Sequence, residues 1–201
     1  MKLLYSPLSP YVRKVMVVAH ELGLADQIET EAQGGTPIDP NPVIVGANPV
    51  GKIPTLITAD HGNLFDSRVI CRYLNSVGGG ALYGQGDAEW PIIGREALAE
   101  GMIDAALLAA YEARLRPEDI RFPPWVEGQR AKVTQGAQAF EVRIGEMSGD
   151  LTIDKIALGC ALGYADFRHA DLGWRDSCPQ LAAWYETFVA RPSMQATLPA
   201  T

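Results

Sequence analysis

The chain has 201 residues, of which 47% are hydrophobic and 20% are charged. This length suits one large domain or two small ones, and the balance of apolar and charged residues excludes a disordered chain. The formal net charge of −7 argues against nucleic acid or an anionic membrane as a partner, because both usually require a basic protein surface.

The first residues of the chain and its cysteines predict a cytoplasmic location and no bound metal. Residues 1–5 lack the long apolar run of a signal peptide. Since no stretch of about 18 uninterrupted apolar residues occurs, we expect no membrane-spanning helix. The sparse cysteines form neither a disulfide framework nor a metal-ligand pattern. We expect Cys71 and Cys160 in the core and Cys178 partly exposed.

The first predicted elements are a strand, a helix and a second strand. Residues 2–5 predict the first strand and residues 27–31 the second. Between them, Ser9 suits a helix N-cap, Pro10 the first helical turn and Gly23 the C-terminal stop. The apolar residues of this helix lie on one face: Val12, Val15, Met16, Ala19 and Leu22.

A long segment rich in Gly, Pro and Asn follows at residues 33–52. It predicts an irregular loop with at most a short helix, and loops of this length are often functional. Residues 55–58 and 63–65 predict two short strands that form a hairpin. A further helix is expected from Ser67.

The order strand–helix–strand, loop, strand–strand–helix predicts an α/β domain over residues 1–77. The glycine-rich residues 78–88 predict a linker. Helical periodicity then continues without a competing strand pattern, so we expect an all-α domain over residues 89–201.

Four helices are expected in this second half. The first spans residues 90–115, the second ends at Gly149, the third begins at Thr152 and the fourth includes residues 181–188. The second contains a seam with spacings of four and three residues, formed by Val133, Ala137, Phe140, Ile144 and Met147.

Four segments resemble conserved segments of the glutathione S-transferase superfamily. Residues 9–15, Ser-Pro-Tyr-Val-Arg-Lys-Val, resemble the Ser-Pro-Phe/Tyr-x-x-Arg/Lys-Val segment of its serine-type bacterial members. Residues 48–56 match the run Asn-Pro-x-Gly-Lys-Val/Ile-Pro-x-Leu, and residues 65–70 resemble the Glu/Asp-Ser-x-x-Ile motif. Residues 190–195 resemble a common Arg-Pro-Ser ending. The resemblance implies a thioredoxin-like N-terminal domain and an all-α C-terminal domain.

The resemblance also implies glutathione as cosubstrate. Its thiol must be held as a thiolate, although a free thiol has a pKa of about 8.5. A hydroxyl donor and a helix N-terminus both favour the anion. Ser9 would combine the two by donating a hydrogen bond to the sulfur, and its alternative role is that of a helix cap alone. Tyr5 is the rival thiol contact, because tyrosine-type members place a phenol near the end of the first strand.

Further glutathione contacts are implied for residues that follow. Pro54 would be cis, so that the main chain of Ile53 pairs with the cysteinyl part of glutathione. Lys52 would contact the glycyl carboxylate, or else be a solvated lysine. Asp66 would take the γ-glutamyl ammonium group, while Ser67 and the helix N-terminus hold the γ-glutamyl carboxylate. Both residues also suit helix capping alone.

The resemblance implies a homodimer and a second substrate site. In many members an acid equivalent to Asp104 reaches the γ-glutamyl ammonium group bound by the partner subunit, whereas a solvated carboxylate is the alternative. The pocket for a small hydrophobic electrophile is expected between the domains, with lining residues from this group: Tyr11, Met102, Ala106, Tyr111, Arg114 and Trp125.

One segment departs from the family pattern. The helix near residue 152 usually opens with a Ser/Thr-x-x-Asp capping box, but Lys155 stands three residues after Thr152, and Asp154 comes one position early. We expect the Thr152 hydroxyl still to cap the helix, without the reciprocal carboxylate.

The leading hypothesis is a detoxifying transferase that adds glutathione to electrophiles. A glutathione-dependent reductase or lyase is disfavoured, because that class commonly uses a cysteine at the start of the first helix, where this chain has Ser9. A regulatory or partner-binding protein that has lost the thiol site is a third interpretation. The Asp66-Ser67 pair and the Lys52-Ile53-Pro54 run argue that glutathione binding is retained.

Overall fold

The computed structural model of this protein describes residues 1–199, and its chain divides into two compact units. The first comprises Met1–Leu82 together with the chain from Pro192 onward, and the second comprises Tyr83–Arg191. None of the helices in the described part of the chain is long and apolar enough to cross a membrane.

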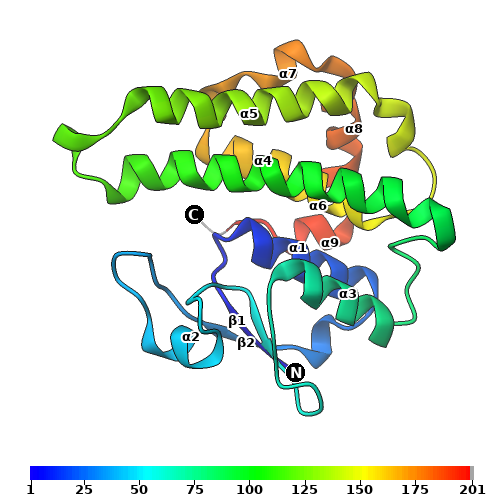
Figure 1. Cartoon of the computed structure of the whole chain (residues 1–201). Coiled ribbons are helices and arrows are strands. Elements are labelled where there is room, and N and C mark those ends of the chain that lie inside the picture. Colours follow the sequence, from blue (N-terminus) through cyan, green and yellow to red (C-terminus); the bar gives the residue numbers. More distant parts are fainter. Residues whose placement is uncertain (200–201) are drawn as a thin grey trace. The chain divides into compact units, whose positions relative to one another are not determined.

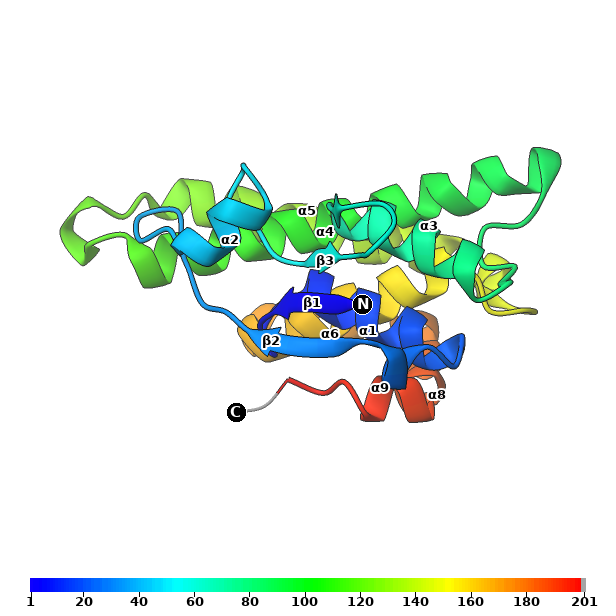
Figure 2. The ribbon, with the colours of Figure 1, turned by 90° about the horizontal axis from the view of Figure 1, so that it is seen from below.

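The first unit contains a four-stranded sheet in the order β2-β1-β3-β4, and Figure 2 shows β2, β1 and β3 in this order. The strands are β1 (Lys2–Tyr5), β2 (Glu29–Ala32), β3 (Thr55–Ile57) and β4 (Asn63–Leu64). β1 pairs with β2 in parallel and with β3 antiparallel, and β4 pairs antiparallel with β3. Leu3 lies opposite Leu56 in the centre, and both are fully buried.

Two helices pack against each other beside this sheet (Figure 1), α1 (Pro10–Glu21) and α3 (Ser67–Val77). A 3-10 turn, η1 (Ala25–Gln27), leads from α1 into β2, and the short α2 (Pro42–Ala47) lies beside β3. This part of the structure confirms the predicted thioredoxin-like order of elements.

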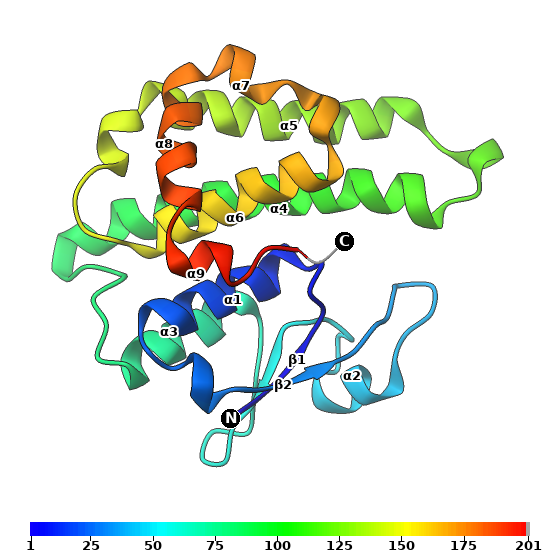
Figure 3. The ribbon, with the colours of Figure 1, turned by 180° about the vertical axis from the view of Figure 1, so that it is seen from behind.

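The last helix, α9 (Pro192–Gln195), packs against α1 (Figure 3). Arg13 donates a hydrogen bond of 3.1 Å from Nη2 to the carbonyl oxygen of Met194. Ser193 is hydrogen bonded to Glu21. The chain therefore returns to the first unit after passing through the second.

The second unit is helical, as predicted. Its α-helices are α4 (Glu89–Leu115), α5 (Pro123–Val142), α6 (Ile153–Arg168), α7 (Trp174–Ser177) and α8 (Pro179–Val189), and its 3-10 turns are η2 (Gly86–Ala88), η3 (Glu118–Ile120), η4 (Ile144–Met147) and η5 (Ala170–Leu172). α4 packs against both α5 and α6 (Figures 1 and 3). Gly136 permits the close approach of α5, because a Cβ atom there would lie 2.6 Å from the Met102 Sδ.

The predicted end of the second helix at Gly149 is wrong. α5 ends at Val142, and Arg143 leaves the helical conformation with φ −105° and ψ 19°. The 3-10 turn η4 then changes the direction of the chain. Met147 is still buried, at 3% exposure, although the predicted apolar seam does not lie on a single helix. A tighter turn at a helix end is a common way to satisfy the last carbonyl groups.

The expectation that Thr152 caps α6 with its hydroxyl is also wrong. Thr152 Oγ1 is buried and has no hydrogen-bond partner among the described residues. Two buried charged side chains lie at the start of α6. Asp154 is fully buried and accepts a 2.6 Å bond from Arg95 Nε. Lys155 donates to the carbonyl oxygens of Ser148 and Asp150.

The third correction concerns Cys178, which we expected to be partly exposed. It is fully buried, as are Cys71 and Cys160, and all three are free thiols. Burial raises the pKa of the Cys178 thiol. The position before Pro179 did not indicate this burial, because Cys178 is covered by tertiary packing.

Candidate functional site

Three sequence-predicted segments meet at one end of the sheet of the first unit. β1 ends at Tyr5, and Leu4 lies opposite Thr55, the first residue of the antiparallel β3. Ile53–Pro54 therefore precede β3 at this same end. Because β4 runs antiparallel to β3, the chain leaves β4 toward Asp66 at this end as well. The N-termini of α1 and α3 follow directly (Figure 1).

The N-terminus of α1 carries the half-buried Ser9. Ser9 is the N-cap, with extended backbone angles of φ −85° and ψ 122°, and its Oγ accepts a 3.3 Å bond from Val12 N–H. Accepting this bond does not use the O–H hydrogen, so the hydroxyl retains its capacity to donate. The positive end of the helix dipole lies at the same place, which favours a negatively charged group there.

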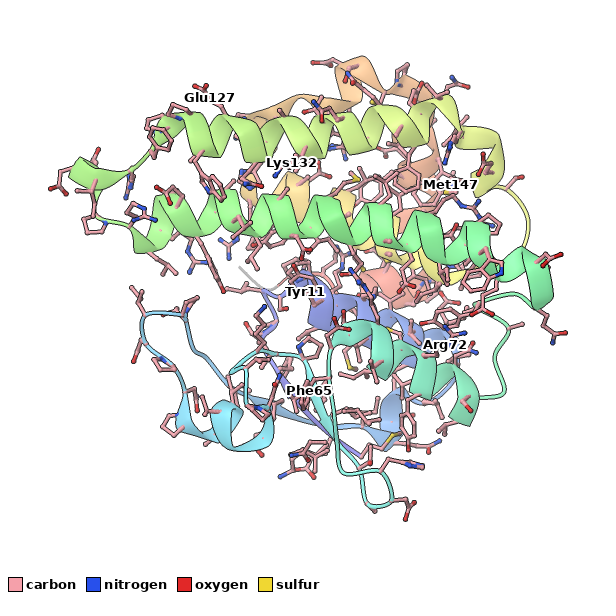
Figure 4. The ribbon with its side chains drawn as sticks, in the orientation of Figure 1. Tyr11, Phe65, Arg72, Glu127, Lys132 and Met147 are labelled. Atoms are coloured by element: carbon pink, nitrogen blue, oxygen red, sulfur yellow. The ribbon has the colours of Figure 1, made fainter. Side chains whose placement is uncertain are left out.

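Tyr5 lies four residues earlier and is also half-buried. Its main-chain carbonyl oxygen accepts a 2.9 Å bond from Gln33 N–H, which extends the pairing of β1 with β2. Tyr11, in the first turn of α1, is half-buried as well, and Figure 4 shows its position there. Two phenols, Tyr5 and Tyr11, and two serine hydroxyls, Ser6 and Ser9, thus belong to the turn between β1 and α1 or flank it.

The loop before β3 is held by a residue whose role the sequence reasoning did not assign. Asn48 is 1% exposed, and its amide donates to the Lys52 carbonyl oxygen at 2.9 Å and accepts from Val50 N–H at 3.1 Å. Thr55 donates to the same Lys52 carbonyl oxygen at 3.0 Å. Gly51 adopts the left-handed φ of 64° that closes this turn. The sequence feature that could have indicated this role is the position of Asn48 as the first residue of the motif at residues 48–56.

The Ile53–Pro54 peptide bond that follows is cis, as expected. Pro54 is buried and Ile53 is half-buried, whereas the side chain of Lys52 is exposed. With its carbonyl oxygen bound twice, Lys52 has a defined main chain and a side chain free to turn toward a ligand.

The N-terminus of α3 is the second helix terminus at this end. Asp66 is its N-cap, with Oδ1 accepting a 2.9 Å bond from Arg68 N–H, and it remains exposed. Ser67 is the first residue of the helix and is 2% exposed. Phe65, labelled in Figure 4, precedes Asp66 through a cis peptide bond. An exposed carboxylate and a helix N-terminus together can receive an ammonium group and a carboxylate group.

The other predicted site residues belong to the second unit. Asp104 is exposed on α4, while Met102 and Ala106 on the same helix are buried. Met102 borders a shallow hollow of about 360 Å³ between α4 and α5, together with Lys132 and Gly136. Figure 4 shows Lys132 on α5. Trp125, near the start of α5, is 46% exposed.

Tyr111 and Arg114 lie in the last two turns of α4 and are half-buried and exposed, respectively. The sequence reasoning did not identify two residues of α6 beside them, Tyr164 and Arg168. Burial raises the pKa of the Tyr164 phenol; the positive charges of Arg168 and Arg114 oppose this rise, and Tyr111 adds to it. Among residues 1–199, no group of three or more His, Cys, Asp or Glu side chains is arranged to hold a metal ion.

Comparison with known proteins identifies both halves of the chain. Residues 8–77 match "Glutathione S-transferase, N-terminal domain", and residues 123–187 match "Glutathione S-transferase, C-terminal domain". An uncharacterized GST-like protein of Escherichia coli K12, YibF, is 30% identical over 99% of this chain and 98% of its own length. Glutathione S-transferase 3 of Zea mays is 28% identical over 100% of this chain and 94% of its own length.

Solved structures are similar over the whole chain. A glutathione transferase family member from Pseudomonas fluorescens Pf-5 with bound glutathione is 41% identical, with a TM-score of 0.96 over 100% of this chain and 99% of that one. A crystal structure of a family member from the same strain holds S-(propanoic acid)-glutathione and has a TM-score of 0.91, at 41% identity over the full length of both chains. A glutathione S-transferase of Methylobacillus flagellatus with glutathione bound is 36% identical, with a TM-score of 0.86 over 99% of both chains.

Proposed function

The chain belongs to the glutathione S-transferase superfamily, and from this we propose that it joins the thiolate of glutathione to small hydrophobic electrophiles. The observation that carries the proposal is the meeting of Ser9, Ile53–Pro54 and Asp66–Ser67 at one end of the sheet, where two helices begin. Relatives of known structure, 36% and 41% identical, hold glutathione or a glutathione conjugate, which supports the same cosubstrate here.

Ser9 activates the thiol in this proposal. Its hydroxyl donates a hydrogen bond to the glutathione sulfur, and the N-terminus of α1 adds a favourable dipole, so that the thiolate is stabilised. Tyr5 is the alternative donor. Ser9 is not itself the nucleophile, because the sulfur of glutathione attacks the electrophile.

The remaining groups hold the rest of the tripeptide. The main chain of Ile53 beside the cis Pro54 pairs with the cysteinyl residue, and Lys52 binds the glycyl carboxylate. Ser67 and the N-terminus of α3 bind the γ-glutamyl carboxylate, while Asp66 binds the neighbouring ammonium group. Each assignment matches charge with opposite charge or an N–H donor with an acceptor.

The second substrate in this proposal is a small hydrophobic electrophile, and of the residues expected to contact it Tyr11 belongs to the first unit, in the first turn of α1. In substitution on an aryl halide, a bond forms between the glutathione sulfur and the ring carbon. The carbon–chlorine bond breaks, and chloride leaves with the electron pair. The proton of the thiol is released to solvent when glutathione binds as a thiolate.

The first experiment titrates the ultraviolet absorbance of the thiolate in glutathione bound to the wild-type protein. The proposal predicts a bound thiol pKa clearly below the free value of about 8.5, together with conjugation of 1-chloro-2,4-dinitrobenzene. If glutathione does not bind, the chain is better described as a partner-binding protein on the same fold. If it binds with a lowered pKa and no electrophile reacts, the protein binds glutathione without transferring it.

We also propose a cytoplasmic homodimer, in which Asp104 reaches the γ-glutamyl ammonium group bound by the partner subunit. Three free, buried cysteines suit a reducing compartment. A shallow hollow of about 370 Å³ on the first unit, lined by His61, Leu64, Val69, Arg72 and Tyr73, provides an apolar surface for a second copy. Sedimentation that finds only monomer at micromolar protein concentration would contradict the dimer and this role of Asp104.

A further inference from the structure

The placement of α2 depends on its two ends, because the helix itself is short and mostly exposed. A helix of six residues is well below the length at which isolated helices persist in water. Among its residues, all of which the structure describes, Ile44 is the one that is buried, while Val43 and Val45 are 50% and 42% exposed. Apolar burial therefore anchors α2 weakly, and the groups that hold its ends decide where it lies.

The C-terminal end of α2 is joined to the loop that carries Lys52. Asn48 is the C-cap, and its main-chain N–H donates to the Ile44 carbonyl oxygen at 2.7 Å. The side-chain amide of Asn48 donates to the Lys52 carbonyl oxygen at 2.9 Å. Asn63 donates a further 2.9 Å bond to the Ala47 carbonyl oxygen. A shift of α2 therefore moves the main chain at Lys52, the residue proposed to bind the glycyl carboxylate of glutathione.

The N-terminal end of α2 is tied to the sheet through Gln33, the residue that follows β2. Figure 2 shows the chain running from β2 to α2. Asn41 is the N-cap of α2, and its Oδ1 accepts a 2.8 Å bond from Val43 N–H. Its Nδ2 donates to Gln33 Oε1 at 3.0 Å and to the Gly34 carbonyl oxygen at 2.7 Å. Gln33 Nε2 donates in turn to Glu31 Oε1 of β2 at 2.7 Å. Two amide side chains thus connect α2 to the edge strand of the sheet.

The chemistry of the groups fixes the direction of each bond in this series. A carboxylate only accepts, so Gln33 turns its NH2 group toward Glu31 and its oxygen is left to accept from Asn41. Asn41 presents its NH2 group because its oxygen accepts the N-cap bond. Lys2 of β1 completes the series with a 3.0 Å bond from Nζ to Glu31 Oε2. Hydrogen bonds from Lys2 and Gln33 lower the pKa of Glu31, which keeps the carboxylate ionised. We call Lys2, Glu31, Gln33 and Asn41 the Gln33 network.

The main chain of Gln33 is fixed at the same end of the sheet as the candidate site. Its N–H donates to the Tyr5 carbonyl oxygen at 2.9 Å, which continues the pairing of β1 with β2. Gly35 then brings the chain close to α2, because a Cβ atom there would lie 3.2 Å from the Asn41 Cβ and 3.6 Å from the Ile44 Cδ1. The sheet therefore fixes the Gln33 backbone, and the Gln33 side chain relates α2 to that fixed point.

We propose that Gln33 is a positioning residue for the glycyl end of glutathione. Through Asn41 and α2 it sets the position of Lys52, without itself contacting the cosubstrate. This inference rests on the proposed binding of glutathione and adds a residue that no sequence motif indicated. Its consequence is specific: replacing Gln33 weakens the recognition of the glycyl carboxylate and not that of the rest of the tripeptide.

The test compares glutathione with its glycyl amide, in which an uncharged carboxamide replaces the carboxylate. Calorimetry gives the Kd of each compound for the full-length protein and for each variant. The quantity compared is the acid preference, defined as the Kd of the amide divided by the Kd of glutathione. General damage to the domain weakens both compounds alike and leaves the acid preference unchanged, whereas displacement of Lys52 lowers it.

We expect the wild type to bind glutathione about ten-fold or more tightly than the amide, the size of one charge-assisted hydrogen bond. Lys52→Met should bring the acid preference close to one. Gln33→Met keeps the length of the side chain without its donor and acceptor, and should lower the acid preference about three-fold or more. Asn41→Ser keeps an N-cap oxygen but loses the amide N–H, so it should lower the acid preference although α2 remains capped.

Two further variants serve as controls. Glu31→Gln keeps an oxygen that accepts from Gln33 Nε2 and should retain most of the acid preference. Gln27→Met removes an exposed glutamine of the same unit, outside the Gln33 network, and should leave the acid preference unchanged. Gln33 and Asn41 are half-buried, and each of their variants tests the proposal separately if the other does not fold.

Conjugation of 1-chloro-2,4-dinitrobenzene, assayed in parallel, separates this inference from the proposed transfer. If no conjugation occurs but the acid preference depends on Gln33 and Asn41, transfer fails and the positioning role stands. If conjugation occurs and Gln33→Met lowers Tm without changing the acid preference, the positioning role is overturned and transfer stands. A wild type that binds glutathione and its amide equally well also overturns the positioning role, because Lys52 then does not bind the glycyl carboxylate.

Discussion

Replacing Ser9 with Ala tests the activation of glutathione and should produce two separable effects. The first concerns stability. The N-cap bond from Val12 N–H to Ser9 Oγ is 3.3 Å long, beyond the usual range for a strong bond. We therefore expect a loss near the low end for N-caps, about 0.5–1 kcal/mol. For a chain of this size that loss lowers Tm by about 1–4 °C, as measured by circular dichroism.

The second effect concerns the thiol. A hydrogen bond from a hydroxyl to an anion contributes about 1.5–3 kcal/mol, and one pKa unit corresponds to about 1.4 kcal/mol. Without the Ser9 hydroxyl, the pKa of bound glutathione should rise by about 1–2 units. The kcat/KM for conjugation near neutral pH should then fall about ten- to a hundred-fold. The assay is the ultraviolet titration of bound thiolate, repeated across variants.

Ser6→Ala is the matched control, because it removes a half-buried hydroxyl from the same turn that accepts only a 3.4 Å bond from Leu8 N–H. Tyr5→Phe tests the alternative donor. If Ser9→Ala lowers Tm but leaves the thiol pKa unchanged, Ser9 is a helix cap alone and the reasoning is refuted. A rise in thiol pKa confined to Tyr5→Phe would transfer the role to the phenol.

Three further substitutions test the packing of the second unit. Asp154→Asn removes a fully buried charge paired with Arg95 and should cost about 3 kcal/mol in urea unfolding; a loss under about 0.5 kcal/mol would mean that the pair behaves as an exposed one. Glu141 accepts two main-chain N–H bonds at the start of α8, and although burial opposes them, these bonds lower its pKa. A lowered folded-state pKa adds stability above the unfolded value that is lost as pH falls, so the stability difference between wild type and Glu141→Gln should shrink below about pH 4.3, and a constant difference would contradict this. Gly136→Ala places a methyl group 2.6 Å from the Met102 Sδ and should cost about 1–3 kcal/mol; an unchanged Tm would show that Met102 moves aside freely.

Local sequence patterns were sufficient for most elements, because their signals lie within a few residues of each other. The Ser9-Pro10 start of α1 and the apolar face that follows predict that helix from capping and periodicity alone. The cis Pro54 was expected from the family resemblance of residues 48–56, and the structure contains it. Where the local pattern ran on past the real boundary, as from Val142 to Gly149, periodicity did not reveal the tighter turn.

Long-range contacts explain the failures. The missing carboxylate after Thr152 indicated only a weaker cap, whereas Asp154 is paired with Arg95, 59 residues away in the chain. Tyr164 of α6 likewise interacts electrostatically with Arg114 of α4. No spacing within one segment encodes such partners, because they are set by the packing of α4 against α6.

The sequence by itself determined the two classes of structure and the three segments at the start of α1, before β3 and at the start of α3. It did so because capping residues, prolines and apolar periodicity act over one or two turns. The tertiary structure decided that these segments meet at one end of the sheet, that α9 returns to α1, and that Asp154 of α6 pairs with Arg95 of α4. These properties depend on strand register and on contacts between residues far apart in the chain, which only folding brings together.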